Sequence, residues 1–106
     1  MFVSYKSAKT TQPVLGVTRR ILANSPGLML TEHILDKGAI LPDHNHPHEQ
    51  LVYLLEGEII IEMNGQKLKV VQGDSLVIPS NVYHKVTALE KSRAMDVFTP
   101  ARTDYL

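Results

Sequence analysis

The sequence has no cysteine, and its 11 basic residues balance its 11 acidic ones, so it carries no formal net charge. The lack of cysteine excludes disulfides, thiolate metal sites and cysteine nucleophiles. The lack of net charge gives no indication of a nucleic-acid or anionic-membrane partner. No apolar run reaches the roughly 18 residues that cross a bilayer. The start, MFVSYKSAKT, lacks the apolar core and cleavage site of a signal peptide, so we expect a cytoplasmic protein.

Long amphipathic helical patterns are missing too, and short apolar runs separated by turn signals occupy most of the chain. Asn64 and Gly65 join two β-rich runs and predict a tight hairpin, because both residues tolerate positive φ. Further strands are expected at 28–35, 75–78 and 94–100, whereas VTRRILAN is compatible with a helical turn or a strand. Turn signals about every 8–12 residues are typical of a β-sandwich or barrel.

Three of the chain's five histidines lie within DHNHPHEQ, residues 43–50. Side chains at alternate positions of a strand face the same side. If the strand continues through the proline of this stretch, one face carries His44, His46 and Gln50. His84, after the turn IPSNVYH, supplies a fourth group. Three imidazoles with one oxygen ligand suit a borderline divalent metal such as Fe, Mn, Ni, Co or Zn.

Two neighbours of these residues, His48 and Glu49, are not the ligands that we expect first. Glu49 has the opposite parity and is expected to point away, although it is an alternative to Gln50 as the oxygen ligand. His48 follows Pro47, which restricts its backbone, so we expect it beside the ligands rather than among them. The other interpretation of the whole cluster is a set of surface histidines on a loop.

Glycines and a proline around the histidines complete two spaced motifs. The first consists of Gly38, His44, His46, Gln50 and Gly57, and the second of Gly73, Pro79, Asn81 and His84. This spacing resembles the two cupin motifs, here at about residues 38–57 and 73–88. The resemblance implies one all-β domain, residues 1–106, with the cupin double-stranded β-helix, a jelly-roll barrel of six to eight strands. It also places the metal inside the barrel near one mouth.

The chain departs from the cupin pattern at three positions. Gln50 stands where the first motif usually has Glu, and Asn81 and Ala88 stand where the second usually has Gly and Asn. The last two departures should alter a turn and a strand position. The first changes the charge, because three imidazoles and a carboxamide leave a divalent metal with both of its positive charges. Such a centre is a stronger Lewis acid and favours an anionic ligand.

The C-terminal stretch DVFTPARTDYL contains a second group of candidate site residues. Asp96 and Phe98 share parity, and Arg102 follows a proline bend that could return it to the barrel mouth. On composition alone, the same pattern also fits an edge strand with a solvated Asp and Arg. The spacing of the three residues resembles that of the KdgF-like, uronate-linearising cupins of pectin and alginate breakdown, in which they line the pocket opposite the metal.

The resemblance implies an enzyme that converts 4,5-unsaturated monouronates to their linear, ketonised form, by ring opening and tautomerisation without redox chemistry. In it, Asp96 would be the general acid and base, Phe98 would pack on the sugar, and Arg102 would pair with the uronate carboxylate. A metal-dependent dioxygenase, a non-catalytic cupin that binds small molecules, and a structural cupin with an incidental metal are the alternatives. The roles of Arg19, Arg20 and His33 stay open.

The expected partner besides a small anionic substrate is a second copy of the chain. Leu51, Tyr53 and Leu55, together with Ile59 and Ile61, form a set too apolar to leave wholly exposed. Part of this set must lie between the two sheets, and the excess predicts a homodimer.

Overall fold

The computed structural model describes residues 2–106, which form ten β-strands and one short 3-10 turn. The elements are β1 (Thr10–Val14), β2 (Val17–Ser25), β3 (Leu28–Leu35), β4 (Ile40–His44), β5 (Glu49–Glu56), β6 (Glu58–Met63), β7 (Gln66–Val71), β8 (Ser75–Ile78), β9 (His84–Ala88), β10 (Ser92–Thr99) and η1 (Thr103–Tyr105). Within residues 2–106, no helix is long and apolar enough to cross a membrane.

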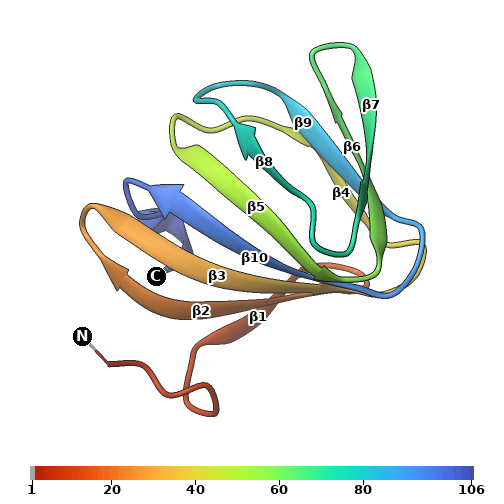
Figure 1. Ribbon diagram of the computed structural model, residues 1–106. Coiled ribbons are helices and arrows are strands. Elements are labelled where there is room, and N and C mark those ends of the chain that lie inside the picture. Colours follow the sequence, from red (N-terminus) through yellow and green to blue (C-terminus); the bar gives the residue numbers. More distant parts are fainter. Residues whose placement is uncertain (1) are drawn as a thin grey trace.

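The strands form two antiparallel sheets that face each other (Figure 1). One sheet has the order β1-β2-β3-β10-β5-β8 and the other has the order β4-β9-β6-β7. This arrangement confirms the all-β, double-sheet jelly roll, but the expectation of six to eight strands was wrong. The N-terminal segment adds two strands: VTRRILAN lies in β2, and β1 covers its edge. Pro13 interrupts the pattern of β1, and an edge strand is where a sheet tolerates proline.

Local turn residues determine where β5, β6 and β7 begin and end. Asn64 and Gly65 have φ values of 51° and 73°, so the predicted hairpin between β6 and β7 is confirmed. Gly57, between β5 and β6, has a φ of 95° and packs against the start of β10. A Cβ atom at this position would collide with the Ser92 hydroxyl and lie 2.6 Å from the Ser92 Cα atom. Only glycine meets both conditions.

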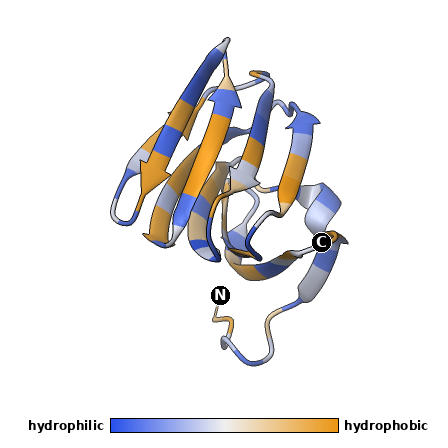
Figure 2. Cartoon of the chain, turned by 90° about the vertical axis from the view of Figure 1, so that its right-hand side faces the viewer, coloured by the Kyte–Doolittle hydropathy of each residue, from blue (hydrophilic) through white to orange (hydrophobic). Residues whose placement is uncertain are grey.

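Alternation of apolar and polar residues divides each sheet into an inner and an outer face (Figure 2). The larger apolar cluster between the sheets includes Leu54, Ile59 and Ile61, all at most 2% exposed. A smaller cluster, with Met29 and Phe98, lies under the C-terminal turn. Both clusters border a cavity that polar side chains also line, and these polar side chains include most of the predicted site residues.

Candidate metal centre

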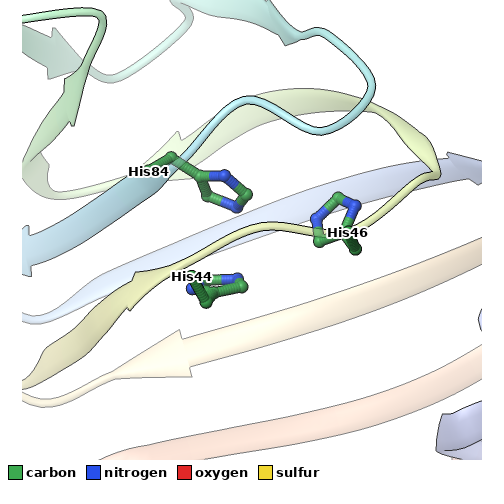
Figure 3. Close-up of side chains that lie close together, drawn as sticks. All are labelled: His44, His46 and His84. Carbon is green, nitrogen blue, oxygen red and sulfur yellow. The ribbon is translucent and has the colours of Figure 1, made fainter.

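Three histidines converge between the sheets (Figure 3). His44 ends β4, His84 begins β9, and the two residues are paired in the β4·β9 register with ring centroids 4.2 Å apart. The ring of His46 lies 5.8 Å from that of His44 and 5.1 Å from that of His84. One ring nitrogen from each residue lies within 4.8 Å of the others. Two ligand atoms on opposite sides of one ion are about 4.2 Å apart when each metal–nitrogen distance is about 2.1 Å. The three rings would therefore need only small movements to bind the same ion.

The histidines and Gln50 come together for a different reason from the one predicted. The predicted continuous strand through Pro47 was wrong, because β4 ends at His44, the chain bends at residues 47–48, and β5 begins at Glu49. The bend carries the chain from one sheet to the other. His44 and Gln50 therefore line the same cavity because both sheets face a common interior, and the shared parity along one strand is not the cause.

Each histidine ring is oriented by a backbone carbonyl. The Nδ1 atoms contact the carbonyl oxygens in the pairs His44–Pro42, His46–His48 and His84–Val82, at 2.8, 3.0 and 2.9 Å. A carbonyl can only accept, so the Nδ1 atoms carry the protons and the Nε2 lone pairs are available for a metal. The sequence does not show these contacts, although His48 lies beside the ligands as expected and contributes its carbonyl.

Burial keeps two of the rings neutral. It is the main reason that the pKa of His46 falls from 6.5 to about 4, and the positive charge of Arg102 lowers it further. Burial is also the first cause that lowers the pKa of His84. Both rings are therefore uncharged at neutral pH, the state that a metal requires of its imidazole ligands.

Gln50 points inward, and Glu49 points to the solvent. The Oε1 atom of Gln50 lies 3.1 Å from Nε2 of His46. Since the His46 proton lies on Nδ1, two lone pairs face each other, an arrangement that a shared cation would stabilise. The other end of the amide donates from Nε2 to Oδ2 of Asp96 at 3.2 Å. The donor set of three imidazoles and an amide oxygen thus fits one divalent transition metal.

Asp96 and Phe98 line a cavity next to the histidines. They lie on β10, which runs between β3 and β5, so the edge-strand alternative is wrong. Asp96 is 5% exposed, and its Oδ1 atom has no hydrogen-bond partner among the described residues. Phe98 is 1% exposed and meets the His46 ring edge to face, with centroids 5.7 Å apart. The cavity volume is about 50 Å³, room for an ion and a few water molecules.

Arg102 folds back over the site as expected, with its Cζ atom 5.2 Å from the centre of the Phe98 ring. Its guanidinium donates from Nε and Nη2 to the two carboxylate oxygens of Asp104, at 3.0 and 2.8 Å. These hydrogen bonds are the main cause that lowers the pKa of Asp104. Nη1 of Arg102 is buried and, within residues 2–106, has no partner. The fork expected to bind a uronate carboxylate is thus occupied by a carboxylate of the chain itself.

Three residues without a role in the sequence interpretation also line the cavity: Arg19, His33 and Tyr105. Arg20, next to Arg19, lies on the opposite face of β2 and contacts Glu32. His33 is 4% exposed. The alternation along a strand places Arg19 and Arg20 on opposite faces of VTRRILAN, and it places His33 on one face of 28–35. The local sequence does not indicate which of the two faces points into the barrel.

Residues 31–99 match the cupin domain family, and the chain belongs to that family. It is 33% identical over 93 residues to the pectin degradation protein KdgF of Dickeya dadantii (strain 3937), with 86% of this chain and 84% of that protein covered. A solved structure of KdgF from Halomonas sp. shares 32% identity and a TM-score of 0.92, covering 100% of this chain and 98% of that one. An RmlC-like cupin from Shewanella frigidimarina NCIMB 400 also gives a TM-score of 0.92, at 30% identity, over 99% and 95% of the two chains. The predicted resemblance to KdgF is confirmed.

Proposed function

We propose that this chain is a metal-dependent enzyme of pectin or alginate breakdown that converts 4,5-unsaturated monouronates to the linear ketonised form. The 33% identity to a pectin degradation protein supports the pathway. One observation carries the chemistry: the buried Asp96 carboxylate is hydrogen-bonded to Gln50, the same amide whose oxygen faces the histidines. The proposed proton-transferring group is therefore hydrogen-bonded to one of the candidate metal ligands.

The proposed ligands are His44, His46, Gln50 and His84. A divalent ion bound there would supply Lewis acidity to substrate oxygens. The ligands carry no charge, and the charges of Arg19 and Asp96 in the cavity lining cancel. The site would therefore keep a surplus of two positive charges, which attracts an anionic substrate such as a uronate.

The proposed reaction moves protons only. The anomeric hydroxyl loses a proton, the bond from the anomeric carbon to the ring oxygen breaks, and an aldehyde forms. The former ring oxygen becomes an enolate oxygen, and a proton added at C4 yields the ketone, so atoms and electrons balance without an oxidant. Asp96 would accept the first proton and deliver the second, through the Oδ1 atom that has no partner in the described chain.

The surrounding side chains would orient the sugar acid. Phe98 offers an apolar surface for the sugar, and Arg102 would bind the carboxylate in exchange for Asp104, whose side chain is 58% exposed. The cavity is smaller than a sugar acid. Binding would therefore move side chains at the mouth, such as Tyr105, outward.

The test is to add the purified, metal-loaded protein to a 4,5-unsaturated monouronate. We expect the ultraviolet band of the unsaturated acid to disappear faster than in buffer, and the NMR spectrum to show the linear ketone. Oxygen uptake with the iron-loaded protein would support a dioxygenase instead. Tight binding of the uronate with no change in rate would support a non-catalytic binding protein.

A further inference from the structure

Three polar side chains form a row across neighbouring strands of the six-stranded sheet. Arg19 on β2 is directly opposite His33 on β3. Asp96 on β10 is opposite Thr31, so His33 is its diagonal neighbour, a separation that long side chains can span. His33 and Asp96 are at most 5% exposed, and all three residues line the cavity.

The contact between Arg19 and His33 determines where the histidine proton lies. Nε of Arg19 donates to Nε2 of His33 at 3.0 Å. A guanidinium has no acceptor, so Nε2 must offer its lone pair. A neutral imidazole then carries its single proton on Nδ1. Arg19 is itself held in place, because its Cζ atom lies 3.7 Å from the centre of the Tyr105 ring.

The Nδ1 atom of His33 faces Asp96. It lies 3.0 Å from Oδ2, but the N–H group approaches this oxygen obliquely and makes no well-aligned hydrogen bond. Gln50 donates to the same oxygen at 3.2 Å. Oδ2 thus accepts one hydrogen bond, from Gln50, and lies in close contact with His33 Nδ1, while Oδ1 has no partner in residues 2–106. The chain thus contacts the carboxylate at Oδ2 and leaves the buried Oδ1 atom without a partner.

We propose that Arg19 and His33 are positioning residues: Arg19 fixes the tautomer of His33, and the resulting Nδ1–H group orients the Asp96 carboxylate so that Oδ1 faces the substrate. The catalytic consequence rests on the proposed function. The tautomer and the orientation do not, because they follow from the contacts of the chain alone. Neither residue contacts the substrate in this role.

The first test is a proton–nitrogen NMR correlation spectrum of the zinc-loaded protein, since Zn²⁺ is diamagnetic. We expect the His33 proton on Nδ1 in the wild type. Arg19→Met keeps the stem but removes the donor, so the proton should redistribute toward Nε2. Arg20→Met is the matched control, because Arg20 lies on the opposite face of β2, and it should leave the His33 signals unchanged. A wild-type proton on Nε2, or an Arg19→Met spectrum identical to the wild type, would overturn the proposal.

The second test separates positioning from a structural role. His33→Leu should lower kcat about 10- to 100-fold with little change in KM, as for other supporting residues of reactive groups. His33→Asn places an amide near the Nδ1 position and should recover part of this loss, whereas a merely structural role would not split kcat from KM. A folded His33→Leu variant with wild-type kcat would contradict the proposal. If the wild type itself gives no turnover, the proposed function fails, and the NMR result alone still decides the arrangement of the three residues.

Discussion

At the residue scale, the site depends on what each polar atom can donate or accept. Gln50 is the clearest case, because its amide presents an oxygen to His46 and an N–H group to Asp96. The carboxylate that cupins usually have at this position could not donate to Asp96 and would face it as a second negative charge. The amide is therefore hydrogen-bonded to Asp96, and it would leave a metal bound in the proposed site more positive than a carboxylate would.

Asp96→Asn tests the role of the carboxylate with almost no change of shape. An amide cannot act as a base, so kcat for the unsaturated uronate should fall about 10²- to 10⁴-fold. The bound metal, measured by elemental analysis, should not change. Glu49→Gln is the control, since this exposed neighbour of Gln50 faces the solvent and should keep both metal and activity. An active Asp96→Asn variant would exclude Asp96 as the proton carrier, and metal loss in Glu49→Gln would restore Glu49 as a ligand.

The buried histidines give the metal-free protein a defined pH dependence. The pKa of His46 is about 4 in the folded chain, compared with the ordinary value of 6.5 that applies to the unfolded chain. Between these values the unfolded chain binds a proton that the folded chain does not, so stability is full above 6.5 and decreases as the pH falls. The slope for one such group is at most about 1.4 kcal/mol per pH unit. Urea unfolding from about pH 7.5 to about pH 5, with EDTA, should show a weaker dependence in His46→Gln; equal slopes would contradict this account.

At the element scale, local turn chemistry made much of the fold predictable. The hairpin at Asn64 and Gly65 and the bounds of β3 and β8 were predicted, because residues adjacent in sequence determine them. The end of β4 was not predicted, since the crossing between sheets depends on packing that no single segment contains. The same limit applies to Arg19 and His33. They reach Asp96 only through the pairing of β2 with β3 and of β3 with β10, which are contacts between distant segments.

Gly57→Ala tests the junction between β5 and β6. The substitution combines a positive φ with a collision against Ser92, so it should lower the free energy of unfolding by at least about 1–3 kcal/mol. Gly27→Ala is the matched control, because no atom lies within 4 Å of the added Cβ and the residue has no positive φ. Its effect should stay within about 0.5 kcal/mol. Thermal unfolding measures both, and equal midpoints for the two variants would contradict the stated need for glycine at position 57.

At the scale of the whole molecule, the outer face of the six-stranded sheet supports the proposed homodimer. Ile59 and Ile61 are buried as expected, but Leu51 is 50% exposed and Tyr53 is 46% exposed. Leu51 is paired with Val77 on one side and with Val97 on the other, so apolar side chains form a row across three strands. Such an exposed apolar row on the outer face of a sheet is typical of an isologous interface between two copies.

Analytical ultracentrifugation tests this proposal. We expect a species of twice the chain mass of 11.9 kDa, and Leu51→Lys should shift it toward the monomer by placing a charge inside the interface. Leu15→Lys is the control, because Leu15 is 97% exposed in the turn between β1 and β2 and should leave the dimer intact. A wild-type monomer at micromolar concentration would contradict the homodimer, and an unaffected Leu51→Lys dimer would place the interface elsewhere.

The most direct test of the whole account relates turnover to bound metal. The chain is stripped with a chelator and reloaded in steps with one divalent metal, and the loss of the ultraviolet band of a 4,5-unsaturated monouronate is followed at each step. We predict a rate that rises in proportion to the metal bound, reaches a plateau at one ion per chain, and stays at the buffer rate in His84→Ala. An accelerated rate that is the same in stripped, reloaded and His84→Ala protein would contradict the account.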